Sequence, residues 1–357
     1  MSWTVAIVGA SGAVGRTMRT CLESSSIEVR ELRLLATPRS AGMTFPFRGH
    51  DCVVEAVTAE LFEGVDLALF SAGAGPSGDW ARVATGRGAW VVDNSSRFRM
   101  DPEVPLVVPE VNAEAIPSTP GLIANPNCST IQMVTALAPI HRRWGLQRVA
   151  VTTYQAVSGT GEKGILALAR ELERWRRAQN VSATEVSSLH GFVFGPGDDR
   201  PAPDSPYAHP VLGNALPQCD VFLEDGYTRE EQKLIDETRK ILGLPELVVQ
   251  PTCVRVPVVT GHSEAIYVET EHQAHPDEVR ALLAGSPGIV VVDDPQAGGY
   301  PLARSAAGTD PVWVGRIRQD RCVPHGLHLW VVADNLRKGA ALNAVQIAER
   351  IWGSRAR

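Results

Sequence analysis

The sequence predicts an α/β fold: a doubly wound, Rossmann-like parallel sheet, followed by an α+β domain with a mixed sheet. Three observations lead to this prediction. The all-apolar run Val5–Val8 passes directly into a glycine loop and then into a helical stretch, which is typical of a parallel strand buried on both faces. Further short apolar runs end in small or polar residues. After Asn125 the strand-like runs become longer and are separated by long loops.

The first part alternates strands with helices, and its strands end in loops that suit ligands. We expect a strand at 5–8, a helix that ends near 23, and further strands at 29–36, 65–70 and 90–93. The last two strands run into Ser71-Ala72-Gly73 and Asn94-Ser95-Ser96. In a doubly wound sheet, ligands bind at the carboxyl ends of the strands, so these loops are candidate binding segments.

The second part contains six strand-like runs, at 148–157, 247–259, 265–270, 289–293, 312–318 and 327–332. Thr228 and Glu231 form a capping box that starts a helix ending at Gly243. A last amphipathic helix spans about 338–352. The stretch 191–217 holds six prolines and four glycines, and we expect an irregular excursion there.

Composition excludes several classes of protein. The 357 residues suggest two domains, and 34 basic against 40 acidic residues give a net charge of −6. A nucleic-acid partner is not expected, because it would need a basic face. No apolar run approaches the roughly 18 residues of a membrane span, and the N-terminus does not read as a signal peptide. We therefore expect a soluble, cytoplasmic protein.

The cysteines do not indicate a metal site or a disulfide framework. None of the six forms a C-x-x-C pair, and none lies near a histidine at the spacing of a zinc site. We therefore expect no metal. Buried positions in the core are expected for Cys21, Cys52, Cys253 and Cys322, while Cys219 is left unassigned.

Gly9, Gly12 and Gly15 lie between a strand and a helix, where the backbone can turn tightly and approach a pyrophosphate at the helix N-terminus. Their spacing, G-x-x-G-x-x-G, departs from the dinucleotide fingerprint, and a tight turn without a ligand is the alternative. At the end of the second strand, Thr37-Pro38-Arg39-Ser40 offers a cation and hydroxyls where an NAD site would place an acidic residue. This favours NADP, unless Arg39 is simply a surface arginine.

Cys128 is the candidate nucleophile. It follows Asn125-Pro126-Asn127 and precedes the helical run 131–137, so it should lie at a helix N-terminus. There the macrodipole and the N–H groups stabilise a thiolate and lower its pKa, and the same N–H groups could hold an oxyanion. A buried structural role is the alternative, although the polar surroundings argue against it.

A nucleophilic thiol needs a proton carrier, and His262 has the most suggestive setting of the nine histidines. Arg255 lies in the predicted strand at 247–259, and His262 directly follows the expected turn at Gly261. A carboxylate-binding guanidinium and an acid/base could therefore lie close together.

These segments together resemble the aspartate-semialdehyde dehydrogenase family along nearly the whole chain. The similar segments are residues 9–15, 93–101, 108–112, 125–130, 154–159, 226–228, 237–240, 255–264, 315–318 and 334–343. The resemblance implies a dinucleotide-binding domain at 1–127, joined by the C-terminal helix at about 336–357. It implies a catalytic and dimerisation domain at 128–335, and a homodimer or a dimer of dimers.

The resemblance also implies a role for each matching residue. Cys128 would form an acyl-enzyme thioester, with His262 as acid/base and Gln155 positioning the acyl group. Arg255 would bind the substrate α-carboxylate, Glu230 its ammonium group, and Arg99 and Lys233 the phosphate, with Asn127 also at the substrate. The NADP site would be lined by Gly9, Ser11, Gly12, Ala13, Val14, Thr37, Arg39, Ser40, Ser71, Ser158, Gly159 and Asn335.

The implied activity is the NADPH-dependent conversion of L-aspartyl 4-phosphate into L-aspartate 4-semialdehyde and phosphate, a step of lysine, threonine, methionine, isoleucine and diaminopimelate biosynthesis. Three alternatives remain open. They are a reductase for another acyl phosphate such as N-acetylglutamyl phosphate, a second copy devoted to a specialised pathway, and a catalytically silent paralogue. Glu230 argues against the first, because an acylated amine has no charge for it to pair with.

Overall fold

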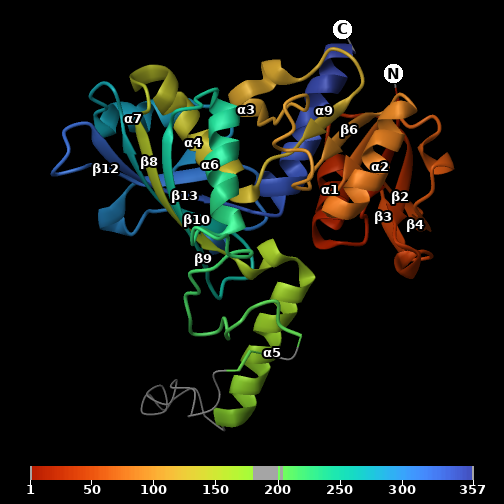
Figure 1. Ribbon diagram of the computed structural model, residues 1–357, viewed down its shortest axis with the longest axis horizontal. Helices are drawn as coiled ribbons and strands as arrows, with labels where there is room; N and C mark the ends of the chain where they lie inside the picture. The colour runs from red at the N-terminus through yellow and green to blue at the C-terminus, as the bar shows by residue number, and fades with distance from the viewer. Residues whose placement is uncertain (1, 180–199, 202–203, 356–357) are drawn as a thin grey trace.

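The computed structural model describes residues 2–179, 200–201 and 204–355 and contains two sheets, each with its own covering helices (Figure 1). The first sheet has the strand order β3-β4-β2-β1-β5-β6-β7. Its strands are β1 (Trp3–Val8), β2 (Val29–Ala36), β3 (Thr44–Phe47), β4 (His50–Ala56), β5 (Leu67–Phe70), β6 (Trp90–Asp93) and β7 (Leu122–Ala124). Only the edge strand β3 is antiparallel to its neighbour. The other six strands follow the Rossmann order, which places the crevice for a ligand between the ends of β1 and β5.

Helices cover both faces of the first sheet, as its apolar strands require. One apolar layer joins the sheet to α1 (Ala13–Glu23) and to the C-terminal helix α9 (Leu342–Arg355). The other layer includes α2 (Ala74–Gly86) and reaches residues of α4 (Cys128–Trp144). The C-terminal helix therefore packs on the N-terminal half of the chain, where a π-helical turn at Arg337–Ala341 leads into it.

The second sheet has the order β11-β12-β13-β10-β8-β9 and is mixed, as predicted. Its strands are β8 (Arg148–Gln155), β9 (Val248–Arg255), β10 (His262–Glu269), β11 (Ile289–Val291), β12 (Val312–Gln319) and β13 (Gly326–Ala333). The helices α4, α6 (Arg229–Leu242) and α7 (Pro276–Ala284) contribute to the apolar layer on one face. The predicted capping box starts α6, and Gly243 ends it in the left-handed conformation.

Some elements were not foreseen. The β3–β4 hairpin and β7 lie in segments to which no strand had been assigned, and α5 (Glu162–Gln179) projects away from both sheets (Figure 1). Two short helices are α3 (Pro109–Asn112) and α8 (Ala303–Ala306). Of the predicted irregular stretch, 191–199 and 202–203 lie outside the described residues, while 204–217 contains no helix or strand apart from one bridge at Leu216.

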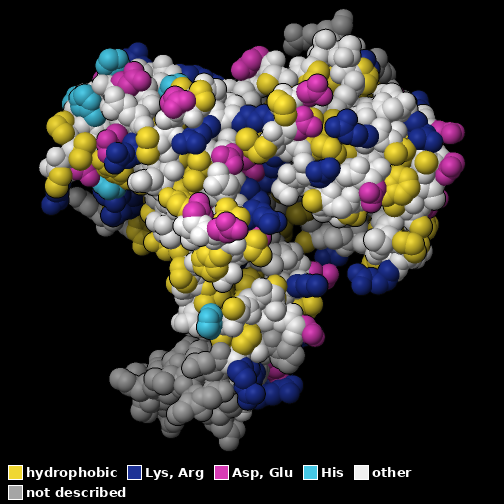
Figure 2. Space-filling model, in the orientation of Figure 1, with side chains coloured by type: hydrophobic (Ala, Val, Ile, Leu, Met, Phe, Trp, Pro, Cys, Tyr) yellow, Lys and Arg dark blue, Asp and Glu magenta, His cyan; other side chains and the backbone are white. Residues whose placement is uncertain are grey.

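The predicted burial of the cysteines is partly wrong. Cys21 and Cys253 are buried, as is the unassigned Cys219. Cys52 is only half-buried because it lies on the edge hairpin, and Cys322 is exposed in the turn between β12 and β13. On the molecular face in Figure 2, basic and acidic side chains are interspersed.

Candidate active site

Cys128 is the first residue of α4, as the sequence predicted, and follows the edge of the first sheet at β7. Asn127 caps this helix, because its side-chain oxygen accepts hydrogen bonds from the N–H groups of Ser129 and Thr130 at 2.9 and 3.3 Å. The backbone of Gly339 packs against the cysteine so closely that a Cβ there would lie 2.8 Å from the Cys128 Cβ. The thiol is therefore held between α4 and the segment that leads into α9.

A cavity of about 250 Å³ lies over Cys128, between the two halves of the chain. Asn94, Ser96, Pro126, Leu336, Gly339 and Ala340 form part of its lining. The remaining lining residues are all among those predicted from the sequence: Val14, Arg99, Asn127, Cys128, Ser158, Gly159, Glu230, Lys233 and Asn335. Tertiary folding thus brings residues from six distant segments to one cavity.

Glu230 is the centre of a hydrogen-bond network at this cavity. Its Oε1 accepts from the Asn127 amide at 2.8 Å and from the Gln155 amide at 3.0 Å, while its Oε2 lies 3.0 Å from the Lys233 ammonium. Burial acts to raise the pKa of Glu230, but Lys233 and the two amides lower it to about 2. The site therefore holds an ionised carboxylate suited to a cationic group on a ligand.

Arg99 is fixed by three partners. Its Nη1 lies 3.0 Å from Oε1 of Glu237, and its Nε and Nη2 donate to the backbone carbonyls of Asn125 and Asn94. The second carboxylate oxygen of Glu237 accepts the backbone N–H of Asn127 at 2.6 Å. Because each terminal nitrogen of a guanidinium carries two N–H groups, Arg99 can still donate to an anion in the cavity that it lines.

His262 is the first residue of β10 and is fully buried. Its Nδ1 accepts the backbone N–H of Ala156 at 3.0 Å. A neutral imidazole that accepts at Nδ1 carries its proton on Nε2, and no partner for Nε2 is found among the described residues. Burial, with a contribution from Arg255, lowers the pKa of His262 to about 3, so the ring is a neutral donor.

The expected lowering of the Cys128 pKa is only partly realised. The N–H of Ser129, at the start of α4, and the cations Arg255 and Arg99 do lower it. Burial and the neighbouring Glu230 outweigh them and raise the pKa of the thiol to about 12. The net shift of the Cys128 pKa is therefore upward and not downward as expected, because desolvation outweighs the helix terminus at this position.

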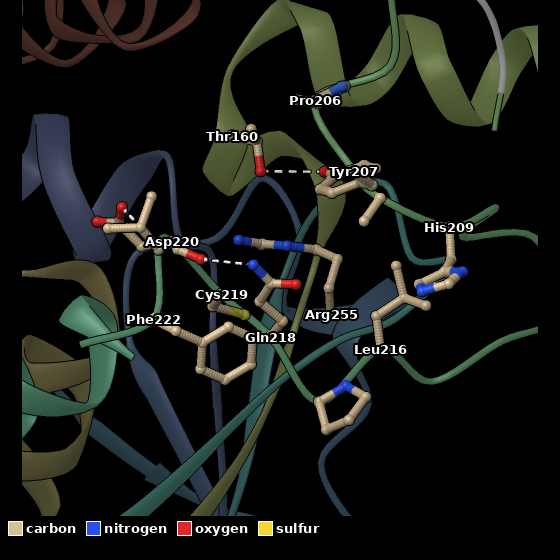
Figure 3. Close-up of a pocket in the computed structure, with 13 residues that line it drawn as sticks. Thr160, Pro206, Tyr207, His209, Leu216, Gln218, Cys219, Asp220, Phe222 and Arg255 are labelled. Carbon is tan, nitrogen blue, oxygen red and sulfur yellow. Dashed lines mark hydrogen bonds between the residues drawn. The ribbon is translucent and has the colours of Figure 1, made fainter. Parts of the chain in front are cut away.

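Arg255 ends β9 and lines a second cavity, of about 500 Å³ (Figure 3). Its Nη1 donates to the Ala156 carbonyl at 2.6 Å, and its buried Nε is without a partner among the described residues. A Cβ on Gly159 would lie 3.0 Å from Arg255 Nη1 and 3.1 Å from His262 Nε2. His262, the predicted acid/base, and Arg255, the predicted carboxylate-binding residue, therefore both lie next to Gly159.

The glycine loop after β1 fits a dinucleotide. Gly9 has a φ of +87°, and a Cβ there would lie 2.4 Å from the Ser71 carbonyl oxygen at the end of β5. A Cβ on Gly15 would lie 2.2 Å from the carbonyl oxygen of Gly9. Gly12 caps α1 without any side-chain hydrogen bond, so the first N–H groups of the helix remain available for a phosphate.

Two further groups of predicted cofactor residues also lie together. Ser11 donates to Ser40 at 3.0 Å, so the glycine loop contacts the turn of Pro38–Ser40, where Arg39 is exposed. The Asn335 amide donates to Ser158 Oγ at 2.9 Å beside the cavity, and its oxygen accepts the N–H of Gly261 at 2.9 Å. The assignment of these residues to the nucleotide remains a prediction.

Three residues of the site were not expected from the sequence. Glu237 lies two helical turns after Glu230, and this spacing on one face of the capped helix could have identified it. Ala156 acts through its backbone, which no side-chain pattern reveals. Asp220, whose carboxylate lies 2.9 Å from Lys233, belongs to a loop with no regular pattern.

Over residues 2–179, 200–201 and 204–355, no group of three or more His, Cys, Asp or Glu side chains could hold a metal ion. None of the helices in those same ranges has the length and apolar character needed to cross a membrane.

The chain is similar to known proteins over nearly its whole length. Residues 4–119 match the semialdehyde dehydrogenase NAD binding domain, and residues 137–338 match the semialdehyde dehydrogenase dimerisation domain. Aspartate-semialdehyde dehydrogenases of Aquifex aeolicus and Bacillus subtilis are 49% and 46% identical to it, and the alignments cover 98% and 97% of this chain and 98% and 96% of those proteins. The crystal structure of aspartate semialdehyde dehydrogenase II from Vibrio cholerae, complexed with ASA, matches with a TM-score of 0.88 and 43% identity over 99% of both chains.

Proposed function

The chain belongs to the semialdehyde dehydrogenase family, and we propose that it converts L-aspartyl 4-phosphate into L-aspartate 4-semialdehyde and phosphate with NADPH. One observation carries the proposal. A thiol at a helix start shares a cavity of about 250 Å³ with an ionised carboxylate and two cations, from Glu230, Arg99 and Lys233. These charges complement a substrate that carries an ammonium group and a phosphate.

In the step that forms the thioester, the sulfur of Cys128 attacks the acyl carbon, and the bond from that carbon to the phosphate oxygen breaks. The thiol proton leaves with the phosphate, so a thioester and hydrogen phosphate result. Arg99 and Lys233 neutralise the leaving group, which stabilises its developing charge. A hydride can reduce a thioester, whose carbonyl is more electrophilic than that of a carboxylate. Covalent catalysis therefore replaces one difficult step with two easier ones.

NADPH, when bound, supplies the hydride that reduces the thioester. The unpartnered Nε2–H of His262 lies beside Gly159 of the cavity wall and would donate to the oxygen that gains negative charge when the thioester is reduced. The carbon–sulfur bond of the thiohemiacetal on Cys128 would then break to release the semialdehyde, and the hydroxyl proton would return through His262 to the sulfur. Gln155 and Asn127 hold Glu230, and Glu230 in turn holds the substrate ammonium. Arg255 binds the α-carboxylate, which fixes the distance from this end of the substrate to Cys128.

The choice of NADP over NAD rests on Arg39 and Ser40, which lie beside Ser11 at the end of β2. An acidic residue at this position would bind the ribose hydroxyls of NAD. A guanidinium instead suits the 2′-phosphate. We therefore assign Thr37, Arg39 and Ser40 to the adenosine end of the cofactor, and Gly9 to Val14 to its pyrophosphate.

We further propose a homodimer through the face of the second sheet that α4, α6 and α7 leave uncovered. Tyr154 on β8 and Val248 on β9 are exposed there, and Tyr154 packs against Trp330 with a ring separation of 5.7 Å. An uncovered apolar sheet face is typical of a subunit interface. We also propose that residues 1–127 and about 336–357 form the dinucleotide-binding domain, and that residues 128–335 form the catalytic and dimerisation domain.

The decisive assay is phosphate-dependent reduction of NADP⁺ by the purified protein with L-aspartate 4-semialdehyde. We expect turnover with this substrate and none with N-acetylglutamate 5-semialdehyde, because Glu230 requires a charged ammonium. Turnover with the acetylated substrate alone would refute the proposal. The relatives named above do not support a reductase for another acyl phosphate or a silent paralogue.

A further inference from the structure

The ammonium group of Lys233 is held by two carboxylates in this structure. Its Nζ lies 3.0 Å from Glu230 Oε2 and 2.9 Å from Asp220 Oδ2. One cation between two anions leaves a local charge of −1, which opposes a phosphate dianion at the same position. A phosphate group that binds Lys233 must therefore displace one carboxylate or share the ammonium with it.

Glu230 is not the carboxylate that moves away from Lys233. It is buried, and its other oxygen accepts hydrogen bonds from Asn127 and Gln155. Moreover, the proposed function uses its charge for the substrate ammonium. Lys233 and Glu230 are also i, i+3 neighbours on α6, so the helix keeps the two side chains within reach of each other.

Asp220 is the carboxylate that can move. It comes from the loop before α6, and its side chain is 32% exposed, against 10% for Glu230. Among the residues that the structure describes, its other oxygen accepts a hydrogen bond only from the N–H of its neighbour Val221, at 2.9 Å. Its backbone is in the left-handed region, with φ of 67°. Nothing else that is described ties this carboxylate to the cavity wall.

There is also room for Asp220 to move. The loop that carries it forms part of the lining of the 500 Å³ cavity, together with Gln218, Phe222 and Arg255 (Figure 3). A rotation of the side chain away from Lys233 would bring the carboxylate toward this water-accessible space. Solvation there compensates for the lost ion pair, which for a partly exposed pair is weak.

We propose that Asp220 sets the affinity of the site for phosphate. Its carboxylate pairs with the Lys233 ammonium when no phosphate is bound, and it competes with the phosphate group for this ammonium. This inference rests on the proposed function, in which Lys233 binds phosphate. Asp220 then weakens binding of inorganic phosphate and favours its release after thioester formation. Phosphate binds Lys233 with full affinity only when the Asp220 carboxylate no longer pairs with the Lys233 ammonium.

Asp220→Asn tests the competition. Asparagine keeps the shape, accepts the Val221 N–H and tolerates the left-handed backbone, so the fold is preserved. We expect the KM for phosphate to fall about two- to fivefold, as the loss of a partly exposed ion pair implies. Glu224→Gln is the matched control, since it removes the same charge from an exposed position on the same loop and should leave this KM unchanged.

A second measurement does not depend on turnover. Inorganic phosphate should protect Cys128 from iodoacetamide, and half-maximal protection should need about two- to fivefold less phosphate in Asp220→Asn. In a Lys233→Met background, the Asp220→Asn change should have no effect. An unchanged or raised phosphate requirement in Asp220→Asn would overturn the proposal, because Asp220 would then merely orient Lys233.

The two proposals can fail separately. If the semialdehyde is not turned over but phosphate protects Cys128 more tightly in Asp220→Asn, the proposed function fails and the competition stands. If turnover is found but phosphate requirements are identical in wild type and Asp220→Asn, the competition is refuted and the proposed function survives.

Discussion

The Nδ1 atom of His262 accepts a hydrogen bond from the backbone N–H of Ala156 at 3.0 Å. This bond selects the neutral tautomer with its proton on Nε2, because a protonated Nδ1 would face another donor. An imidazolium is therefore disfavoured by local geometry as well as by burial. In the proposed reaction, His262 would act as a hydrogen-bond donor from a neutral ring.

The first prediction concerns the titration of His262. Burial lowers its pKa to about 3, so the ring should stay neutral with Nε2–H between pH 5 and 8. Nitrogen-15 NMR of labelled histidine, with His262→Asn for assignment, measures this directly. A resonance that titrates near the ordinary histidine value of about 6.5 would contradict the assignment.

The same pKa predicts how stability depends on acid. The folded value of about 3 lies below the unfolded value near 6.5, so the unfolded chain binds more protons between them. The contribution of His262 to stability is thus fully present above pH 6.5 and is lost as the pH falls toward 3. Urea unfolding of wild type and His262→Asn across this window should show the smaller pH slope in the variant.

The second prediction tests the nucleophile. Cys128→Ala should abolish turnover and leave NADPH binding intact, because the thioester cannot form while the glycine loop is unchanged. Initial rates and fluorescence titration with NADPH measure the two properties. Cys322→Ala is the control, since this cysteine is exposed in a distant turn. Activity retained in Cys128→Ala would mean that another group attacks the substrate.

The third prediction uses the close approach at Gly159. An alanine Cβ would lie 3.0 Å from Arg255 Nη1 and 3.1 Å from His262 Nε2, so both side chains must shift. Contacts of this length make the neighbouring atoms move by a few tenths of an ångström. Since a misplacement of about 1 Å can lower a rate about hundredfold, the loss should be smaller than that. We expect kcat/KM to fall in Gly159→Ala while the thermal midpoint changes little. Gly86→Ala, with open space around the new Cβ, should retain full activity; equal rates in both would show that the contact is unimportant.

The fourth prediction concerns Arg255. Lysine keeps the charge but loses the planar fork that binds a carboxylate through two hydrogen bonds. One charged hydrogen bond contributes about 1.5–3 kcal/mol, so kcat/KM for L-aspartate 4-semialdehyde should fall roughly ten- to hundredfold in Arg255→Lys. Arg321→Lys, at an exposed position in the β12–β13 turn, serves as the control. Wild-type efficiency in Arg255→Lys would remove Arg255 from the substrate site.

The fifth prediction separates NADP from NAD. Arg39→Ala should raise the KM for NADP⁺ about tenfold, because a charged hydrogen bond to the 2′-phosphate is lost, and should leave the KM for NAD⁺ unchanged. Arg87→Ala, at the C-terminal end of α2, is the control. Equal changes for both cofactors would indicate a general effect on the adenosine pocket.

Patterns confined to a few neighbouring residues could be interpreted from the sequence alone. The run Val5–Val8 and the glycines after it predict the first βα unit, since tight turns and buried parallel strands have local signatures. The capping box at Thr228 and the stop at Gly243 define α6 for the same reason. The ordered motifs led to the family, and the position of Cys128 at a helix start followed from its neighbours.

The tertiary structure decided what depends on contacts between distant segments. The pKa of Cys128 is set by burial and by Glu230, about a hundred residues away in the chain, and no local pattern reports desolvation. The tautomer of His262 depends on the backbone N–H of Ala156, directly after β8, and the charge at Lys233 depends on a loop that carries Asp220. Sequence by itself therefore determined the fold class, the family and the candidate residues. Only the packing of the two sheets determined the protonation and pairing of these residues, because electrostatic energies depend on distance and solvent exposure.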